Sequence, residues 1–165
     1  MTVLAPIFIL VSMPPDPRPA DDAMLPVLLK PGRGVFGLFI RDALVEAGFA
    51  DMPANGGYVL GLLEPDGAGL SEVVTDLGVS KQTASQLIDT LVVRGYVERA
   101  ADPDDRRRVL LTLTERGGVA SGVVFSTAQM VHDRLLAIVG VERMTHTKET
   151  LAALLSLRDA SAQER

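Results

Sequence analysis

Residues 70–99 of the chain read LSEVVTDLGVSKQTASQLIDTLVVRGYVER, and this stretch decides the fold. Its first eight residues place apolar side chains at helical spacing, which predicts a short helix with Glu72 favourably placed in its first turn. Gly78 then stands where a tight turn needs a positive φ, and Ser80 is a typical N-cap for a second helix over 81–95. Two short helices joined by a glycine-containing turn predict a helix-turn-helix.

The periodicity changes after Gly95 in a way that predicts a β-hairpin. Residues 96–99 and 109–114 are rich in β-forming side chains, and Asp102-Pro103 between them is a typical turn initiator. The connecting segment 100–108 is charged nearly throughout. A hairpin in this place is the wing of a winged helix.

The second helix of a helix-turn-helix fits the major groove of B-DNA, where residues near its start reach the base edges. The residues so placed here are Lys81, Gln82, Ser85 and Gln86. Gln can form two hydrogen bonds with adenine, whereas Ser and Lys discriminate less between bases. The same residues also fit an ordinary solvated helix face, so the helix alone does not decide between the two.

The predicted wing favours DNA binding. Arg106, Arg107 and Arg108 are consecutive, so at least one of them points outward from a strand, and a narrow minor groove attracts arginine. Asp105 beside them can orient a guanidinium group, but it also subtracts from the local charge. Residues 80–116 carry seven positive and six negative side chains, so a hairpin whose charges satisfy one another is the alternative.

Phosphate contacts supply salt-dependent affinity for DNA and come from basic side chains around the reading helix and the wing. We expect them from Lys81, Arg94, Arg99 and Arg106.

Amphipathic segments flank the winged unit on both sides. In chain order, helices are expected over about 34–47, which precedes it, over about 54–63, which lies at its start, and over about 119–139 and 147–159, which follow it. Apolar residues in the third of these repeat at spacings of four and three, which is a heptad-like seam. Helices with an apolar stripe but little core of their own need a partner, and a second copy of the chain is the simplest one.

We therefore expect a mainly α fold with a small β-hairpin wing, of the α+β class, in three parts. Residues 1–30 are an arm, apolar and then Pro-rich; 31–52 and 118–165 are dimerisation helices; 53–117 are the winged helix-turn-helix. The apolar run 3–11 is too short to span a bilayer, so no membrane partner is expected.

Composition excludes several other classes of protein. The 165 residues fit one ordinary domain, and a net charge of -5 excludes a globally basic coat for nucleic acid. The absence of cysteine excludes disulfides, thiolate zinc sites and cysteine nucleophiles, and nothing asks for an oxidising compartment, so we expect a cytoplasmic protein. We expect no enzyme and no cofactor, because no nucleophile–base pair, phosphate-cradling loop or nucleotide fingerprint is present. His132 and His146 are the only histidines, which makes a metal site a weak hypothesis.

The chain resembles the MarR (multiple antibiotic resistance regulator) family of winged helix-turn-helix proteins. The motifs that carry the resemblance are Leu77-Gly78-Val79-Ser80, Arg94-Gly95-Tyr96-Val97-Glu98-Arg99, Asp104-Asp105-Arg106-Arg107 and Leu113-Thr114-Glu115-Arg116-Gly117. The match is dense from about residue 53 to 117. The resemblance implies a homodimeric transcription regulator, often a repressor that releases DNA when it binds a small, often aromatic, ligand.

The resemblance also implies roles for individual residues. Ser85 and Gln86 would read the major groove, and Arg107, supported by Asp105, would serve the tip of the wing. A ligand pocket is implied between the first helix and the winged unit. We place Phe36, Phe39 or Tyr58 in its lining.

Some residues depart from the family pattern. Many members carry Arg where this chain has Gln86, so an operator sequence cannot be transferred, and Gly56-Gly57 is an atypical helix start. Without cysteine the chain cannot be a thiol-based peroxide sensor. We predict a ligand-responsive repressor that binds a pseudo-palindromic operator on double-stranded DNA as a homodimer. The alternative, favoured by the overall acidity, is a winged-helix protein-interaction module without DNA binding.

Overall fold

A computed structural model describes residues 24–63, 67–101 and 109–163, with side chains as far as 157. The described chain is mainly helical with one three-stranded antiparallel sheet, which confirms the predicted fold class. The chain divides into two compact units, Met1–Gly34 and Val35–Arg165. The sites discussed below lie wholly within the second unit.

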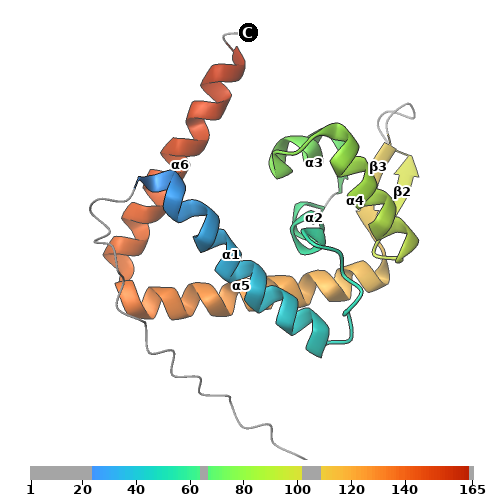
Figure 1. Cartoon of the computed structure of the whole chain (residues 1–165), viewed down its shortest axis with the longest axis horizontal. Helices are drawn as coiled ribbons and strands as arrows, with labels where there is room; N and C mark the ends of the chain where they lie inside the picture. The colour runs from blue at the N-terminus through green and yellow to red at the C-terminus, as the bar shows by residue number, and fades with distance from the viewer. Residues whose placement is uncertain (1–23, 64–66, 102–108, 164–165) are drawn as a thin grey trace, which may run out of the picture. The chain divides into compact units, whose positions relative to one another are not determined.

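The elements follow one another as the sequence patterns predict, with one addition (Figure 1). In chain order they are α1 (Leu25–Glu46), α2 (Gly56–Leu62), β1 (Ala68–Gly69), α3 (Leu70–Leu77), α4 (Lys81–Val93), β2 (Val97–Ala101), β3 (Val109–Leu113), α5 (Glu115–Val139) and α6 (Val141–Gln163). No helix within the described ranges combines the length and the hydrophobicity needed to cross a membrane.

The helix-turn-helix of α3 and α4 is held at its ends by local hydrogen bonds. At the start of α3, the backbone N–H of Gly69 donates to Glu72 Oε2 at 2.8 Å. Gly78 ends this helix with φ at +63°, the left-handed conformation that favours glycine. Ser80 Oγ accepts from the backbone N–H of Thr83 at 3.1 Å and so caps α4 as predicted.

The sheet has the strand order β1-β3-β2. The hairpin pairs Val97 with Leu113 at its base and Ala101 with Val109 at its far end, so the predicted wing is confirmed as a pair of strands. The edge strand β1 pairs with Leu110 and Leu111 of β3. It was not predicted, because a two-residue strand has no alternating pattern to reveal it.

Three helices begin earlier than the periodicity predicts. α1 starts at Leu25 rather than near 34 and continues through Pro31, where a helix loses one backbone hydrogen bond. α5 starts at Glu115 rather than 119, because Thr114 Oγ1 caps it by accepting from the N–H of Gly117 at 3.0 Å. α6 starts at Val141 rather than 147, since only Gly140 separates it from α5.

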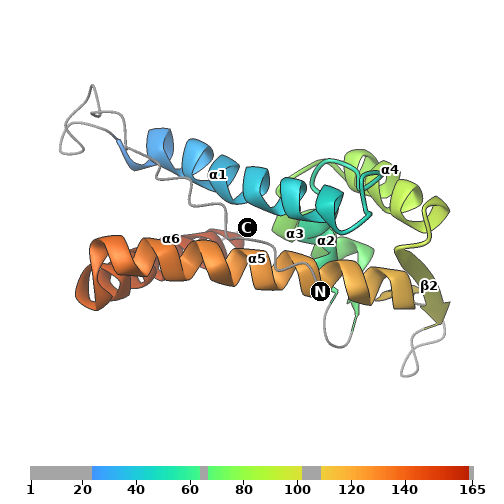
Figure 2. The same ribbon diagram turned by 90° about the horizontal axis from the view of Figure 1, so that it is seen from below.

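α5 is the long helix of the second unit. It runs from the sheet at its N-terminal end to α6 at its C-terminal end, and α2 packs against it (Figure 2). Its first turn comes very close to the start of β2. The core of the winged unit fills the space between these elements. Its largest fully buried side chains are Tyr96, Leu60, Leu63, Ile88, Leu91 and Leu111.

Gly117 is required for the close approach between α5 and the strand that follows α4. A Cβ atom at this position would lie 2.0 Å from the carbonyl oxygen of Tyr96 and 3.4 Å from Leu113 Cβ. The neighbouring Gly118 has no atom within 4 Å of such a Cβ. The backbone, and not the flexible end of a side chain, blocks the first position, so the contact cannot be relieved locally.

We expect Gly117→Ala to lower the free energy of unfolding by about 1–3 kcal/mol, the usual cost of forcing extra volume into a packed site. Gly118→Ala is the matched control and should leave stability unchanged or raise it by up to about 1 kcal/mol, because alanine is the better helix former. Urea unfolding of both variants measures the difference. Equal stabilities would contradict the proposed close approach.

Candidate nucleic-acid interface and ligand cavity

α4 presents the predicted base-reading residues on one side and core residues on the other. The buried side consists of Ala84, Ile88 and Leu91. On the opposite side Lys81, Gln82 and Gln86 are exposed, while Ser85 is half-buried. The structure therefore brings the four predicted residues together near the capped start of one helix. Whether they contact bases stays a prediction.

Two of the predicted phosphate-binding arginines make contacts within the chain. The Arg99 guanidinium on β2 donates to Asp89 Oδ1 on α4 at 2.5 Å, with side-chain exposures of 44% and 60%. Arg94, at the end of α4, donates to the backbone carbonyl of Asp51. An exposed ion pair contributes little to stability, but it fixes the direction of the guanidinium group.

The remaining predicted residues of the wing cannot be placed. Asp105, Arg106 and Arg107 lie between the two hairpin strands in sequence and fall outside the described residues. Their predicted roles at the wing tip stay predictions.

Asp51 and Arg116 form a polar cluster with Tyr96 that the sequence did not reveal. The Tyr96 hydroxyl donates to Asp51 Oδ1 at 2.6 Å, and the Arg116 guanidinium donates to the same oxygen at 2.8 Å. Arg116 also donates to the Tyr96 hydroxyl at 3.0 Å and to the backbone carbonyl of Arg94 at 2.6 Å. Its guanidinium carbon lies 4.3 Å from the centre of the Tyr96 ring, within the range of a cation–π contact.

The cluster shifts the titration of both acidic members. The hydrogen bond from Tyr96, together with the charge of Arg116, holds the pKa of Asp51 below its ordinary value of 3.8. Burial and the hydrogen bond to Asp51 raise the pKa of Tyr96 from 10.0 to about 12. Asp51 is therefore a carboxylate, and Tyr96 a neutral donor, across the physiological range.

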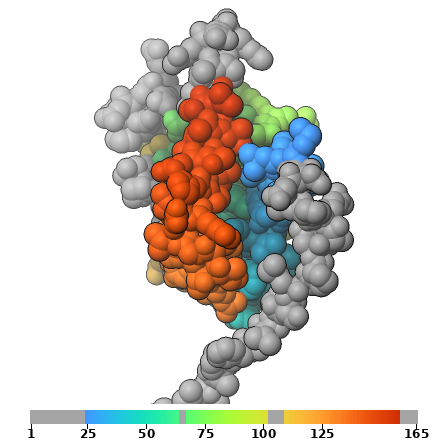
Figure 3. Space-filling model, turned by 90° about the vertical axis from the view of Figure 1, so that its left-hand side faces the viewer, coloured from blue at the N-terminus to red at the C-terminus, as the bar shows by residue number. Residues whose placement is uncertain are grey.

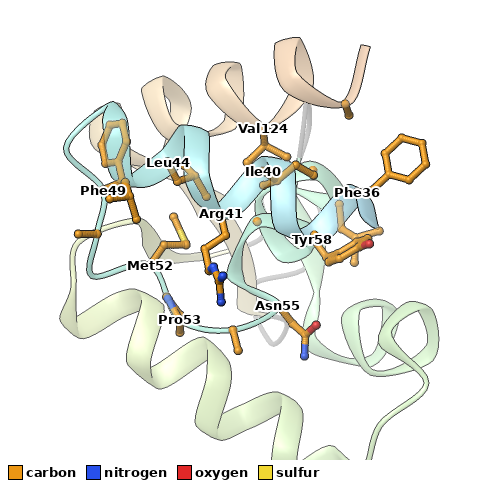
Figure 4. A pocket seen from close by; sticks show the side chains of 18 residues that line it. Phe36, Ile40, Arg41, Leu44, Phe49, Met52, Pro53, Asn55, Tyr58 and Val124 are labelled. Atoms are coloured by element: carbon orange, nitrogen blue, oxygen red, sulfur yellow. The ribbon is translucent and has the colours of Figure 1, made fainter. Parts of the chain in front are cut away.

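A cavity of about 650 Å³ lies between the second half of α1, the loop that follows it, α2 and α5 (Figure 4). Its walls are mostly apolar, and the loop residues Phe49, Met52 and Pro53 form one of them. The volume lies in the range of pockets that hold small molecules.

Of the three aromatic residues placed in this pocket from the sequence, Phe36 and Tyr58 line the cavity. Phe39 is not among the lining residues, and Arg134 lies over its ring at 5.9 Å. Arg41, which was not predicted, brings a positive charge to the lining and extends from α1 between Met52 and Tyr58 in Figure 4. Its side chain is 71% exposed.

The described residues contain no group of three or more histidine or carboxylate side chains that could hold a metal ion. His146 Nδ1 lies 3.2 Å from Glu149 Oε2, one turn away on α6.

Comparison with known proteins connects this geometry with one family. A sequence profile of the MarR family matches residues 57–108. An uncharacterized protein of Mycobacterium tuberculosis (strain ATCC 25618 / H37Rv) is 32% identical over 79 residues, which cover 48% of this chain and 55% of that protein. The match thus spans about half the length of this relative.

Two solved structures illustrate the likeness of fold. CouR from Rhodococcus jostii RHA1, bound to p-coumaroyl-CoA, is 25% identical with a TM-score of 0.65, over 78% of this chain and 88% of CouR. MepR of S. aureus, in complex with DNA, is 21% identical with a TM-score of 0.66, over 82% of this chain and 98% of MepR.

The raised pKa of Tyr96 makes stability depend on pH in the alkaline range. Between pH 10.0 and about 12 the unfolded chain loses the tyrosine proton while the folded chain keeps it, so the free energy of unfolding should fall as pH rises. Tyr58→Phe leaves Tyr96 as the only tyrosine, and the ultraviolet absorbance of tyrosinate then reports its titration directly. We expect a midpoint well above 10.0 in the folded protein and a return to the ordinary value in urea. A folded-state midpoint at the ordinary value would contradict the cluster.

Proposed function

The winged helix-turn-helix of this chain belongs to the MarR family of transcription regulators, and from this premise we propose that the chain binds specific double-stranded DNA as a homodimer. The observation that carries the proposal is the geometry of α4. Its apolar side is buried in the core, its start is capped by Ser80, and its polar residues face outward beside the hairpin. This is the arrangement that a reading helix needs in the major groove.

We assign the base contacts to Gln82, Ser85 and Gln86, and phosphate contacts to Lys81 and the arginines. Arg94 and Arg99 can serve this role while bonded within the chain, because a guanidinium carries five N–H donors and each uses only part of them here. In the wing, Arg107 would enter the minor groove with Asp105 orienting it, and Arg106 would bind phosphate.

A second copy of the chain would cover apolar side chains that α5 and α6 leave exposed. The surface coloured orange to red in Figure 3 belongs to these helices. The exposed large apolar residues on them are Val119, Phe125, Met130, Leu135, Ile138, Val141, Leu154, Leu155 and Leu157. A two-fold dimer built on this face would favour a pseudo-palindromic operator with half-sites about 10 bp apart.

We further propose that the cavity binds a small aromatic ligand that releases the DNA, which makes the chain a ligand-responsive repressor. Apolar walls with Phe36 and Tyr58 suit a planar ring, and Arg41 suits an acidic group on that ring. The structure of CouR, which has a similar fold, contains bound p-coumaroyl-CoA, and that of MepR contains bound DNA. These two structures support ligand binding and DNA binding as proposed here.

A winged-helix protein-interaction module without DNA binding is the second candidate. It is favoured by the net charge of -5, since an acidic protein gains no general attraction to a polyanion. Salt dependence separates the two functions, because a protein that makes 6–10 phosphate contacts loses about 10³–10⁵ in affinity between 50 and 200 mM salt.

We expect the chain to bind the duplex from upstream of its own gene and to lose affinity steeply with salt. Lys81→Ala, Arg106→Ala and Arg107→Ala should each weaken binding and lower the salt slope by about one. Gln86→Ala should cost about 1–3 kcal/mol and relax the choice of base at one position. Fluorescence anisotropy over a salt series measures all four variants, with Lys148→Ala, which removes one positive charge from an exposed side chain outside the winged unit, as the control. Wild-type affinity in both wing variants would remove the assigned role of the wing.

The cavity is tested with two probes, 4-hydroxybenzoate and 4-hydroxycinnamate, by calorimetry on the DNA-free protein. Phe36→Ala should weaken binding about two- to tenfold, the value of one aromatic contact. Phe39→Ala is the matched control, because its ring does not line the cavity, and should leave binding unchanged. Arg41→Gln should cost at most about fivefold, since the side chain is exposed. Equal effects of the two phenylalanine variants would show that the probes bind elsewhere.

A further inference from the structure

Asp51 lies at a junction between the cavity and the helix-turn-helix. Its chain neighbours Ala50 and Met52 both line the cavity, as do Phe49 and Pro53 beyond them. Asp51 itself is not among the lining residues, and it bonds to the end of α4, to the residue just before β2 and to the first turn of α5. The loop therefore forms a wall of the cavity and also bonds to Arg94, Tyr96 and Arg116 of the winged unit.

The segment Arg94–Tyr96, which links α4 to β2, is held on several sides. Arg94 donates from its side chain to the Asp51 carbonyl, while its own carbonyl accepts from Arg116 at 2.6 Å. The carbonyl of Gly95 accepts from Thr114 Oγ1 at 2.6 Å, and the Tyr96 hydroxyl donates to Asp51 Oδ1. A displacement of Asp51 would thus act directly on the end of α4.

The aromatic contacts follow the same path. The Phe49 ring lies 6.1 Å from the Tyr96 ring, and the Arg116 guanidinium lies 5.9 Å from Phe49 and 4.3 Å from Tyr96. A cavity-wall side chain is thereby packed against two groups that hold the end of α4. Tyr96 itself is fully buried in a close-packed core. A displacement of Phe49 would therefore move the groups that contact Tyr96, because the ring cannot shift into solvent.

We propose that Asp51 is a positioning residue that couples the cavity wall to the C-terminal end of α4 through Tyr96, Arg94 and Arg116. In this scheme, which rests on the proposed function, a ligand that shifts the loop moves α4 and lowers DNA affinity. The coupling itself is a property of the unliganded chain and does not depend on which ligand binds.

The direction in which Asp51→Asn changes DNA affinity distinguishes a positioning role of Asp51 from a purely electrostatic one. Asp51→Asn keeps a side-chain oxygen for the Tyr96 hydroxyl but removes a negative charge and leaves the charge of Arg116 without its carboxylate partner. Each of those two changes favours a polyanion, so electrostatics alone predicts tighter DNA binding. If Asp51 positions the end of α4, the same substitution should instead weaken DNA binding. Glu46→Gln removes the same charge from the exposed end of α1, five residues earlier, and is the matched control.

The experiment combines hydrogen exchange of the full chain with DNA affinity at fixed salt. Asp51→Asn should raise exchange at the amides of Arg94, Gly95 and Tyr96, which bond to carbonyls of α4 at 2.9–3.0 Å. Arg116→Gln should raise exchange at Phe49 and Met52 in the loop. Asp51→Asn should weaken binding to the upstream duplex about fivefold or more, as for other coupled sites. Glu46→Gln should change neither quantity in this direction.

The outcomes distinguish failure of the proposed DNA binding from failure of the coupling. If wild-type protein binds no duplex, the proposed function fails, while the exchange measurements still decide the coupling. If wild-type protein binds but Asp51→Asn binds as tightly or more tightly, or if exchange rises only within the mutated segment, the coupling is refuted. Should Asp51→Asn not fold, Arg116→Lys replaces it: one ammonium group cannot reproduce the three bonds that the guanidinium makes to Asp51, Tyr96 and the Arg94 carbonyl, and the loop amides should again exchange faster. Unchanged exchange in that variant also refutes the coupling.

Discussion

The burial of the Tyr96 side chain governs the rest of the winged unit. The residue is fully buried, and a buried hydroxyl without a partner costs about 1–3 kcal/mol. The partner is Asp51, which is 45 residues away in sequence. The loop after α1 must therefore reach the end of α4, and this requirement ties the loop to the helix-turn-helix. On the backbone side, the carbonyl of Tyr96 leaves room only for glycine at position 117.

Three arginines of the winged unit bond to groups of the same chain, and this matters for how an acidic protein can bind DNA. Arg94, Arg99 and Arg116 each bond to groups of the same chain. Each of these three positive charges is therefore held at a defined position by bonds within the chain. With a net charge of -5 there is no general field to draw the protein to a duplex, so affinity must come from groups held at the right positions. Rigid placement of α4 and β2 is for this reason a condition of binding.

Local sequence signals predicted the fold where the decisive contacts are local. Ser80 and Gly78 act within a few residues, so the two helices and their turn were predictable from pattern alone. The hairpin was predictable for the same reason, whereas the two-residue β1 was not. The polar cluster was also invisible, because Asp51 and Arg116 are 65 residues apart and no pattern links them. In the cavity, Phe36 and Tyr58 were predicted from the resemblance, and Arg41 was missed because an arginine on a helix is usually a solvated residue.

The loop between α1 and α2 has two roles that constrain each other. A ligand changes an equilibrium only if it binds two states with different affinity, so a cavity with rigid walls would bind without any effect on DNA. A loop with no bonds to the reading unit would move without effect as well. Here the wall residue Phe49 packs against Tyr96, and the neighbouring Asp51 bonds to it. The bonds that stabilise the fold in this region are thus the same ones through which the cavity can act on α4. If the proposed coupling holds, a substitution that stabilised the loop independently of Tyr96 would preserve the fold and weaken the effect of a ligand on DNA affinity.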